Sequence, residues 1–237
     1  MIILPAIDLK DGKCVRLRQG RADDSKVYSD NPSEMARHWV DEGACYLHVV
    51  DLDGAFQGKP VHLSAIADIL KSVDIPVEVG GGLRTDEDIK AVLDCGVDRA
   101  ILGTRAVESP DSLSALLDEF GEKLAVGIDA RNGMVQGRGW VNASEMSAVA
   151  LAEKMDALGV HTIIYTDIAT DGMLMGPNIE DTAEICRKVK CRVIASGGIT
   201  RPGDIQALKN LEASNLVGAI VGKALYEGTV SLSELQD

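Results

Sequence analysis

The sequence feature that most restricts the possible folds is an internal repeat, because the first half of the chain recurs in diluted form in the second half. Three pairs of segments carry it: 7–12 (IDLKDG) and 128–133 (IDARNG), 77–82 (VEVGGG) and 193–198 (VIASGG), and 101–104 (ILGT) and 220–223 (IVGK), at offsets of 121, 116 and 119 residues. Each half therefore carries one aspartate and one pair of glycine-containing turns. This symmetry predicts two carboxylates for proton transfer and two places to bind an anion.

Short β-branched runs alternate with amphipathic stretches of about 10 to 15 residues, a pattern typical of repeated βα units around a parallel sheet. We expect strands near residues 2–8, 45–51, 76–80, 98–103, 124–129, 161–166, 192–196 and 216–222. The length of 237 residues is close to the roughly 250 residues of one (β/α)8 barrel. The sequence therefore predicts an α/β fold: a single TIM barrel over residues 1–237, built from half-barrels of about 1–120 and 121–237.

Two helix starts are expected from local signals. Thr85 followed three residues later by Asp88 predicts a capping box, and Ser109 before Pro110 predicts an N-cap followed by a first-turn proline.

Composition excludes several classes of protein. The net charge of −13 argues against a nucleic-acid partner, which requires a basic surface. No apolar run approaches the roughly 18 residues of a membrane span, and the first residues do not resemble a targeting signal. The five scattered cysteines are typical of reduced thiols in a cytoplasmic protein, and neither they nor the four histidines show metal-ligand spacing. We expect no metal, and a monomer, because the predicted outer helices show no unpaired apolar face.

Active sites of this fold lie where the strands end. The residues expected there are Asp8, Asp51, Gly82, Gly103, Asp129, Thr166, Gly198 and Gly222. Asp8 ends the first strand and Asp129 ends the fifth, so the two carboxylates face each other across the barrel mouth. Such a pair can remove a proton from one atom and deliver one to another, as an isomerase requires. The alternative is that each aspartate only precedes a glycine turn.

Glycines end the strands that are expected to form two anion sites. Gly197 and Gly198 with Gly222 and Lys223 end strands seven and eight, the usual phosphate site of this fold. Gly82, Gly103 and Thr104 stand at the matching places of the first half, which predicts a second phosphate opposite the first. A tight turn without a ligand is the alternative for any one glycine.

Several motifs resemble one family of enzymes. They are 5–12 (PAIDLKDG), 49–55 (VVDLDGA), 80–84 (GGGLR), 166–168 (TDI), 171–172 (DG), 176–178 (GPN), 196–198 (SGG) and 222–226 (GKALY). In order and spacing they resemble the phosphoribosylformimino-5-aminoimidazole carboxamide ribotide (ProFAR) isomerases of histidine biosynthesis. The resemblance implies a two-fold repeated barrel and an Amadori rearrangement of an aminoaldose to an aminoketose. It also implies a small-molecule substrate with a phosphate at each end, and no metal or organic cofactor.

The resemblance also assigns roles to individual residues. It implies that Asp129 is the acid that opens the ribose ring and that Asp8 is the base that removes the proton from carbon 2. Thr166 and Asp171 match supporting positions.

Two loops of the family contact the substrate. Arg16 and Gly20 match the loop that closes over it, and Trp140 matches an aromatic residue that stacks on it, with a surface anchor as the alternative. For Asp51 we expect a structural role, either holding loop residues or contacting Arg16.

Three other functions compete with this one. A bifunctional isomerase would also act on phosphoribosylanthranilate, and the segment 138–140 (RGW) resembles the corresponding loop of those enzymes. They usually have serine where this chain has Gly80. The related cyclase usually has cysteine-leucine-aspartate where this chain reads Ala6-Ile7-Asp8. The third alternative, a phosphate-binding barrel without catalysis, would not need an acid and a base on opposite strands.

Overall fold

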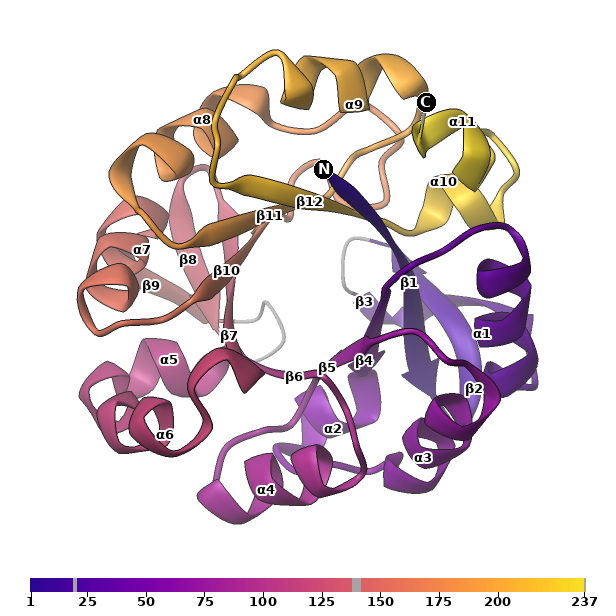
Figure 1. Ribbon diagram of the computed structural model, residues 1–237, viewed down its shortest axis with the longest axis horizontal. Helices are drawn as coiled ribbons and strands as arrows, with labels where there is room; N and C mark the ends of the chain where they lie inside the picture. Colours follow the sequence, from indigo (N-terminus) through magenta and orange to yellow (C-terminus); the bar gives the residue numbers. More distant parts are fainter. Residues whose placement is uncertain (19–20, 138–141, 237) are drawn as a thin grey trace.

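The computed structural model describes residues 1–18, 21–137 and 142–236. In these ranges eight parallel strands form a closed barrel (Figure 1). They are β1 (Ile2–Lys10), β4 (Leu47–Asp51), β5 (Val77–Gly80), β6 (Arg99–Leu102), β7 (Leu124–Arg131), β10 (Thr162–Asp167), β11 (Arg192–Ser196) and β12 (Leu216–Val221). Each strand pairs with its neighbours in this order, and β12 pairs with β1 to close the ring. The predicted TIM barrel and all eight strands are confirmed.

Helices follow every parallel strand and surround the barrel (Figure 1). They are α1 (Pro32–Asp41), α2 (Leu52–Gln57), α3 (Leu63–Ser72), α4 (Asp86–Asp94), α5 (Thr104–Glu108), α6 (Leu113–Phe120), α7 (Ala148–Ala157), α8 (Ile179–Lys188), α9 (Pro202–Lys209), α10 (Lys223–Tyr226) and α11 (Leu232–Gln236). Within the described ranges, none of these helices has the length and apolar character needed to cross a membrane.

One of the two predicted helix starts is confirmed in full, and the other is confirmed in position but begins a 3₁₀ helix. Thr85 and Asp88 form the capping box of α4, each side chain accepting a hydrogen bond from the other residue's backbone N–H. Ser109 takes the N-cap position and Pro110 begins the first turn, but the turn is a 3₁₀ helix and Ser109 makes no side-chain cap bond. Since proline fixes its own φ but does not specify an α-helix, α6 begins later, at Leu113.

Two antiparallel hairpins, which the sequence pattern did not predict, extend the barrel strands beyond the rim. β2 (Lys13–Arg18) and β3 (Arg21–Ser29) follow β1, while β8 (Met134–Gly137) and β9 (Asn142–Ser147) follow β7. Each hairpin begins at a two-residue turn in which both residues have positive φ, the geometry that matches strand twist. The hairpins therefore place Arg16 and Gln136 beside the barrel mouth.

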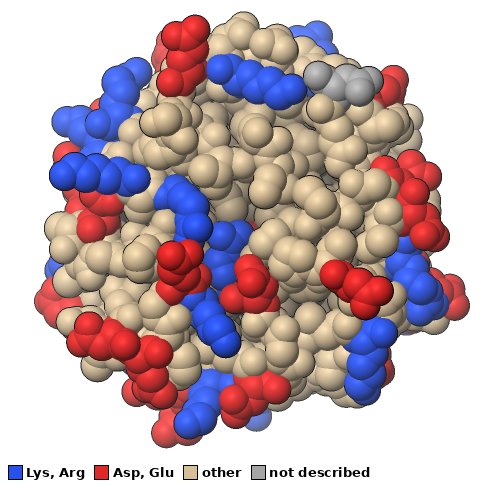
Figure 2. Space-filling model, in the orientation of Figure 1, with Lys and Arg blue, Asp and Glu red and all other residues tan. Residues whose placement is uncertain are grey.

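The barrel interior holds its own apolar layer, separate from the core between barrel and helices. Its members are Leu4, Ala6, Tyr46, Ile101, Ala125, Ile164, Ile194 and Ile220. The end of the barrel where the strands begin contains a cavity of about 320 Å³. Figure 2 shows the molecule from this end, with charged side chains of both signs interspersed around the surface. The polar pocket described below lies at the other end, where the strands finish.

Candidate functional site

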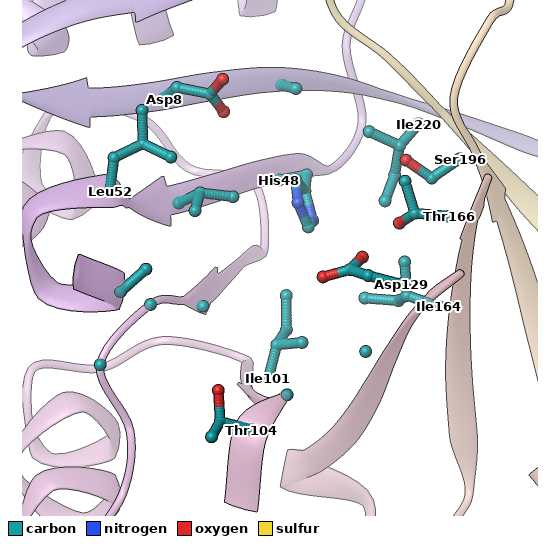
Figure 3. A pocket seen from close by; sticks show the side chains of 18 of the residues that line it. Asp8, His48, Leu52, Ile101, Thr104, Asp129, Ile164, Thr166, Ser196 and Ile220 are labelled. Carbon is teal, nitrogen blue, oxygen red and sulfur yellow. The ribbon is translucent and has the colours of Figure 1, made fainter. Parts of the chain in front are cut away.

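A cavity of about 220 Å³ opens where the eight strands end, and each of them contributes at least one lining residue. Figure 3 shows Asp8, Asp129 and Thr166 among the side chains that line it. The predicted rim residues Gly82, Gly103 and Thr104 line the same cavity, together with Arg16 and Asp171. The structure therefore brings together in one pocket residues that the sequence places more than half the chain apart.

Asp8 lies on β1 and forms an ion pair with Arg16 of β2. The Arg16 Nη1 to Asp8 Oδ2 distance is 2.9 Å, and the two side chains are only 12% and 13% exposed. Burial by itself would lower the pKa of Arg16, but the negative charges of Asp8 and Asp171 outweigh it and raise that pKa. Arg16 is therefore a permanent cation inside the pocket.

Asp129, Thr166 and Asp171 line the pocket from the second half of the chain. Thr166 of β10 lies directly beside Asp129 of β7 in the sheet register. Burial raises the pKa of Asp171, and the charges of Asp8 and Asp129 raise it further, whereas Arg16 and Lys223 oppose the shift. Asp171 is thus closer to its protonated form than an exposed aspartate. Three carboxyl groups share this pocket, in an arrangement suited to proton transfer.

The first of the two predicted anion sites is a small recess at the ends of β11 and β12. Gly197, Gly198, Gly222, Lys223 and Arg16 all line it. A Cβ atom at Gly222 would lie 2.1 Å from the Arg16 guanidinium, so the cation rests directly against this backbone. Lys223 Nζ donates to the carbonyl of Gly172 at 2.8 Å. Two cations therefore meet at one recess, although the protein carries a large negative net charge.

The second predicted anion site, at the ends of β5 and β6, lies in the main cavity. Arg84 lines the cavity beside Gly82, Gly103 and Thr104. Arg105, which follows Thr104, instead pairs with Asp86 at 2.6 Å. Arg84 is therefore the cation that lines the cavity beside these residues.

The glycine turns at the two sites also have a packing role. Gly81 and Gly197 both have positive φ, and a Cβ atom there would lie 2.1 Å from the Asp51 carbonyl oxygen and 2.6 Å from that of Asp167. Only glycine avoids both the strained φ and the clash. These glycines therefore hold the strand ends against the neighbouring loops.

Asp51 has the structural role expected of it. It is buried, and its carboxylate accepts hydrogen bonds from the backbone N–H groups of Gly54, Val61 and His62 at 2.7 to 2.9 Å. It thereby holds the loop after β4. Contact with Arg16, the other possibility for Asp51, is not among its bonds.

Two of the predicted site residues cannot be placed, and two residues that were not predicted line the cavity. Gly20 and Trp140 lie outside the described residues. His48 and Gln136 line the cavity but were not singled out, because no sequence motif marks them; His48 was recognisable only as a polar residue in a strand expected to be buried on both faces. In the described part of the chain, no group of three or more histidine, cysteine or acidic side chains is arranged to hold a metal ion.

Fold and site together define a (β/α)8 barrel with a carboxylate-lined pocket and cationic groups at both ends. A comparison with known families identifies it further: the model of the histidine biosynthesis protein family matches residues 2–231. The chain belongs to this family.

Individual relatives are similar over nearly the whole chain. Proteins of Rippkaea orientalis, Syntrophomonas wolfei and Hahella chejuensis are 55%, 51% and 50% identical to it. The alignments cover 99%, 98% and 100% of this chain and 91%, 96% and 97% of the relatives. All three are named 1-(5-phosphoribosyl)-5-((5-phosphoribosylamino)methylideneamino)imidazole-4-carboxamide isomerase, which is the ProFAR isomerase.

Proposed function

We propose that this protein is a ProFAR isomerase, which converts the aminoaldose end of its bisphosphate substrate to an aminoketose in histidine biosynthesis. The observation that carries the proposal is the pocket itself, in which carboxylates from opposite strands share the main cavity with Arg84, and Arg16 and Lys223 line the adjoining recess. Relatives that share half or more of its residues carry the same name.

In the proposed reaction the two aspartates handle different protons. Asp129 protonates the ring oxygen of the ribose, and the ring opens to a Schiff base. Asp8 then removes the proton from carbon 2, and the electrons of that C–H bond move toward the nitrogen to form the enolamine, which tautomerises to the aminoketose. Asp171 and Thr166 support the site: burial raises the pKa of Asp171, so this carboxyl group holds a proton more readily than an exposed aspartate.

The substrate is proposed to lie across the barrel with a phosphate at each end. One phosphate binds Lys223 and Arg16 near Gly197, Gly198 and Gly222, and the other binds near Gly82, Gly103 and Thr104. The reacting ribose then faces Thr166 and Asp171. The imidazole end lies over the apolar wall of the first half, which comprises Val50, Leu52, Ala55, Phe56 and Leu83.

The limited space around Gly80 favours an isomerase with a single substrate over a bifunctional one. A Cβ atom there would lie 3.3 Å from Cβ of Ile101, tighter than ordinary contact. The serine usual in the bifunctional enzymes would therefore need Ile101 to move.

We also propose that the protein is a monomer that acts in the cytoplasm, without nucleic-acid or membrane partners. The five free cysteines support the proposed compartment.

A coupled spectrophotometric assay tests the proposal. Purified protein is given ProFAR, and in parallel phosphoribosylanthranilate, with a chelator present. Turnover of ProFAR alone is expected. Turnover of both substrates would establish the bifunctional enzyme, and binding of ProFAR without turnover would establish the non-catalytic barrel.

A further inference from the structure

His48 is a polar side chain in the pocket to which the reaction described above gives no role. It lies on β4 opposite Ala6 of β1, one step deeper in the barrel than Asp8. Its side chain is 12% exposed, and Figure 3 shows the ring pointing into the pocket that Asp8 and Asp129 also line.

Glu78, the neighbour of His48 in the sheet register, is fully buried and engaged at both carboxylate oxygens. Its Oε1 lies 2.7 Å from His48 Nδ1. Its Oε2 accepts hydrogen bonds from Nε and Nη2 of Arg99 at 3.1 and 2.8 Å. A carboxylate held by a guanidinium in this way is ionised and accepts hydrogen bonds only. The hydrogen in the contact with His48 therefore belongs to Nδ1.

Arg99 is itself held in place from several sides. Its guanidinium lies over the ring of Tyr46, 4.8 Å from the centroid, and Nη1 reaches Thr162 Oγ1 at 3.4 Å. The carboxylate of Glu78 is thus fixed by a rigid partner, and the imidazole of His48 is fixed by the carboxylate. A buried ion pair adds little to stability compared with apolar residues of similar size, so this pair needs another explanation.

We propose that Glu78 is a positioning residue that holds His48 in its Nδ1–H form, and that His48 Nε2 accepts a hydrogen bond from a hydroxyl group of the sugar. In the neutral ring the second nitrogen carries a lone pair, and in the described part of the chain His48 Nε2 has no hydrogen-bond partner. The identity of the sugar in this inference rests on the proposed function. The tautomer of the His48 ring does not depend on it.

Nitrogen-15 NMR of the imidazole rings in the intact protein tests the tautomer without substrate. At pH 8 the wild type is expected to show His48 with the proton on Nδ1 alone. In Glu78→Gln, whose amide can donate or accept, a mixture of tautomers is expected. If the glutamine variant does not fold, Glu78→Asp keeps the charge facing Arg99 but withdraws it from the ring. A proton on Nε2, or on both nitrogens, in the wild type would overturn the assignment.

A double-mutant cycle on kcat/KM for ProFAR tests the function. His48→Asn is expected to lower kcat/KM roughly tenfold through the lost hydrogen bond, and Glu78→Asp by a smaller factor. The double variant should be no slower than His48→Asn alone, because Glu78 acts through the ring. His161→Asn, which changes an exposed histidine, is the matched control and should equal wild type.

The results of these experiments distinguish a failure of the inference about His48 from a failure of the proposed isomerase function. Wild-type activity in His48→Asn would remove His48 from the reaction, and multiplicative losses in the double variant would show that Glu78 acts independently of the ring. A wild type without ProFAR turnover would refute the proposed function, while the NMR measurement would still decide the link between Glu78 and His48.

Discussion

The first and second halves of the barrel have closely similar backbones at the pocket. The turn at Asp11 and Gly12 has φ angles of 51° and 74°, and the turn at Asn132 and Gly133 has 53° and 73°. Gly103 and Gly222 share an unusual conformation, with φ and ψ of −99° and −90° in one and −115° and −95° in the other. The repeat visible in the sequence therefore corresponds to a repeat of local geometry, while the half-barrel boundary near residue 120 stays a prediction.

The side chains on these matching backbones differ in chemistry. At the offset of 116 residues, Thr166 and Asp171 of the second half correspond to Val50 and Ala55 of the first, and all four line the pocket. At the offset of 119 residues, Lys223 corresponds to Thr104. At these three matched positions the second half therefore carries the more polar side chain, although Arg16, His48 and Arg84 of the first half also line the pocket. A symmetric scaffold has become a site suited to an asymmetric substrate.

Replacing the shared aspartates should have the largest effect. Asp8→Asn and Asp129→Asn are each expected to lower kcat for ProFAR by about 10²- to 10⁴-fold, because an amide neither removes nor delivers the proton. Steady-state kinetics at saturating substrate measure this, with circular dichroism to establish that each variant is folded. Near wild-type turnover in either variant would break the assignment of one proton transfer to each half.

Asp51 ends β4 and Asp167 ends β10, the barrel strands next to those that carry Asp8 and Asp129. The contributions of these two buried aspartates to the free energy of unfolding can be compared. Asp51 accepts three backbone N–H groups, whereas Asp167 accepts one backbone N–H and the amide of Asn178. Loss of these bonds should lower the free energy of unfolding by about 3 kcal/mol in Asp51→Ala and about 2 kcal/mol in Asp167→Ala. Urea denaturation measures both, and a larger loss in Asp167→Ala would contradict the expectation.

The two anion sites should differ in their contribution to binding. Lys223→Met is expected to raise KM about 100-fold and Thr104→Val about tenfold, because a charge-assisted hydrogen bond to phosphate is stronger than one from a hydroxyl. Since neither group handles a proton, kcat should change less than KM. If Thr104→Val raised KM more than Lys223→Met, the anion site of the first half would contribute more to binding than that of the second, contrary to this expectation.

The smallest expected effect is a pH-dependent change in thermal stability that arises from Asp171. Burial raises its pKa above 3.8, so the folded protein holds this proton more tightly than the unfolded chain does. Its contribution to stability is therefore complete below about pH 4 and is lost as the pH rises through the folded pKa. The asparagine variant does not titrate at this position. Its Tm relative to wild type should thus be about 2 °C higher at pH 7 than at pH 4, and a difference independent of pH would show that the pKa is not raised.

Much of the fold and part of the site follow from local sequence signals. The eight strands, the rim residues and the capping box at Thr85 were predicted from periodicity and turn residues, and the structure has them. The hairpins after β1 and β7 were not predicted, because their outer strands β3 and β9 are polar and lack the apolar alternation that marks a barrel strand. His48 was missed for another reason: its partners Glu78 and Arg99 lie on two further strands.

Local sequence signals specify the eight barrel strands and their turns, because β-branched periodicity and glycine conformation depend on neighbours along the chain. Tertiary structure alone decided which side chains meet: Asp8 with Arg16, the three carboxyl groups in one pocket, and His48 with Glu78. The physical reason is that contacts between distant residues depend on strand register and on closure of the barrel. A shift of one residue in a strand would turn its inward side chains outward, and no local signal reports that choice.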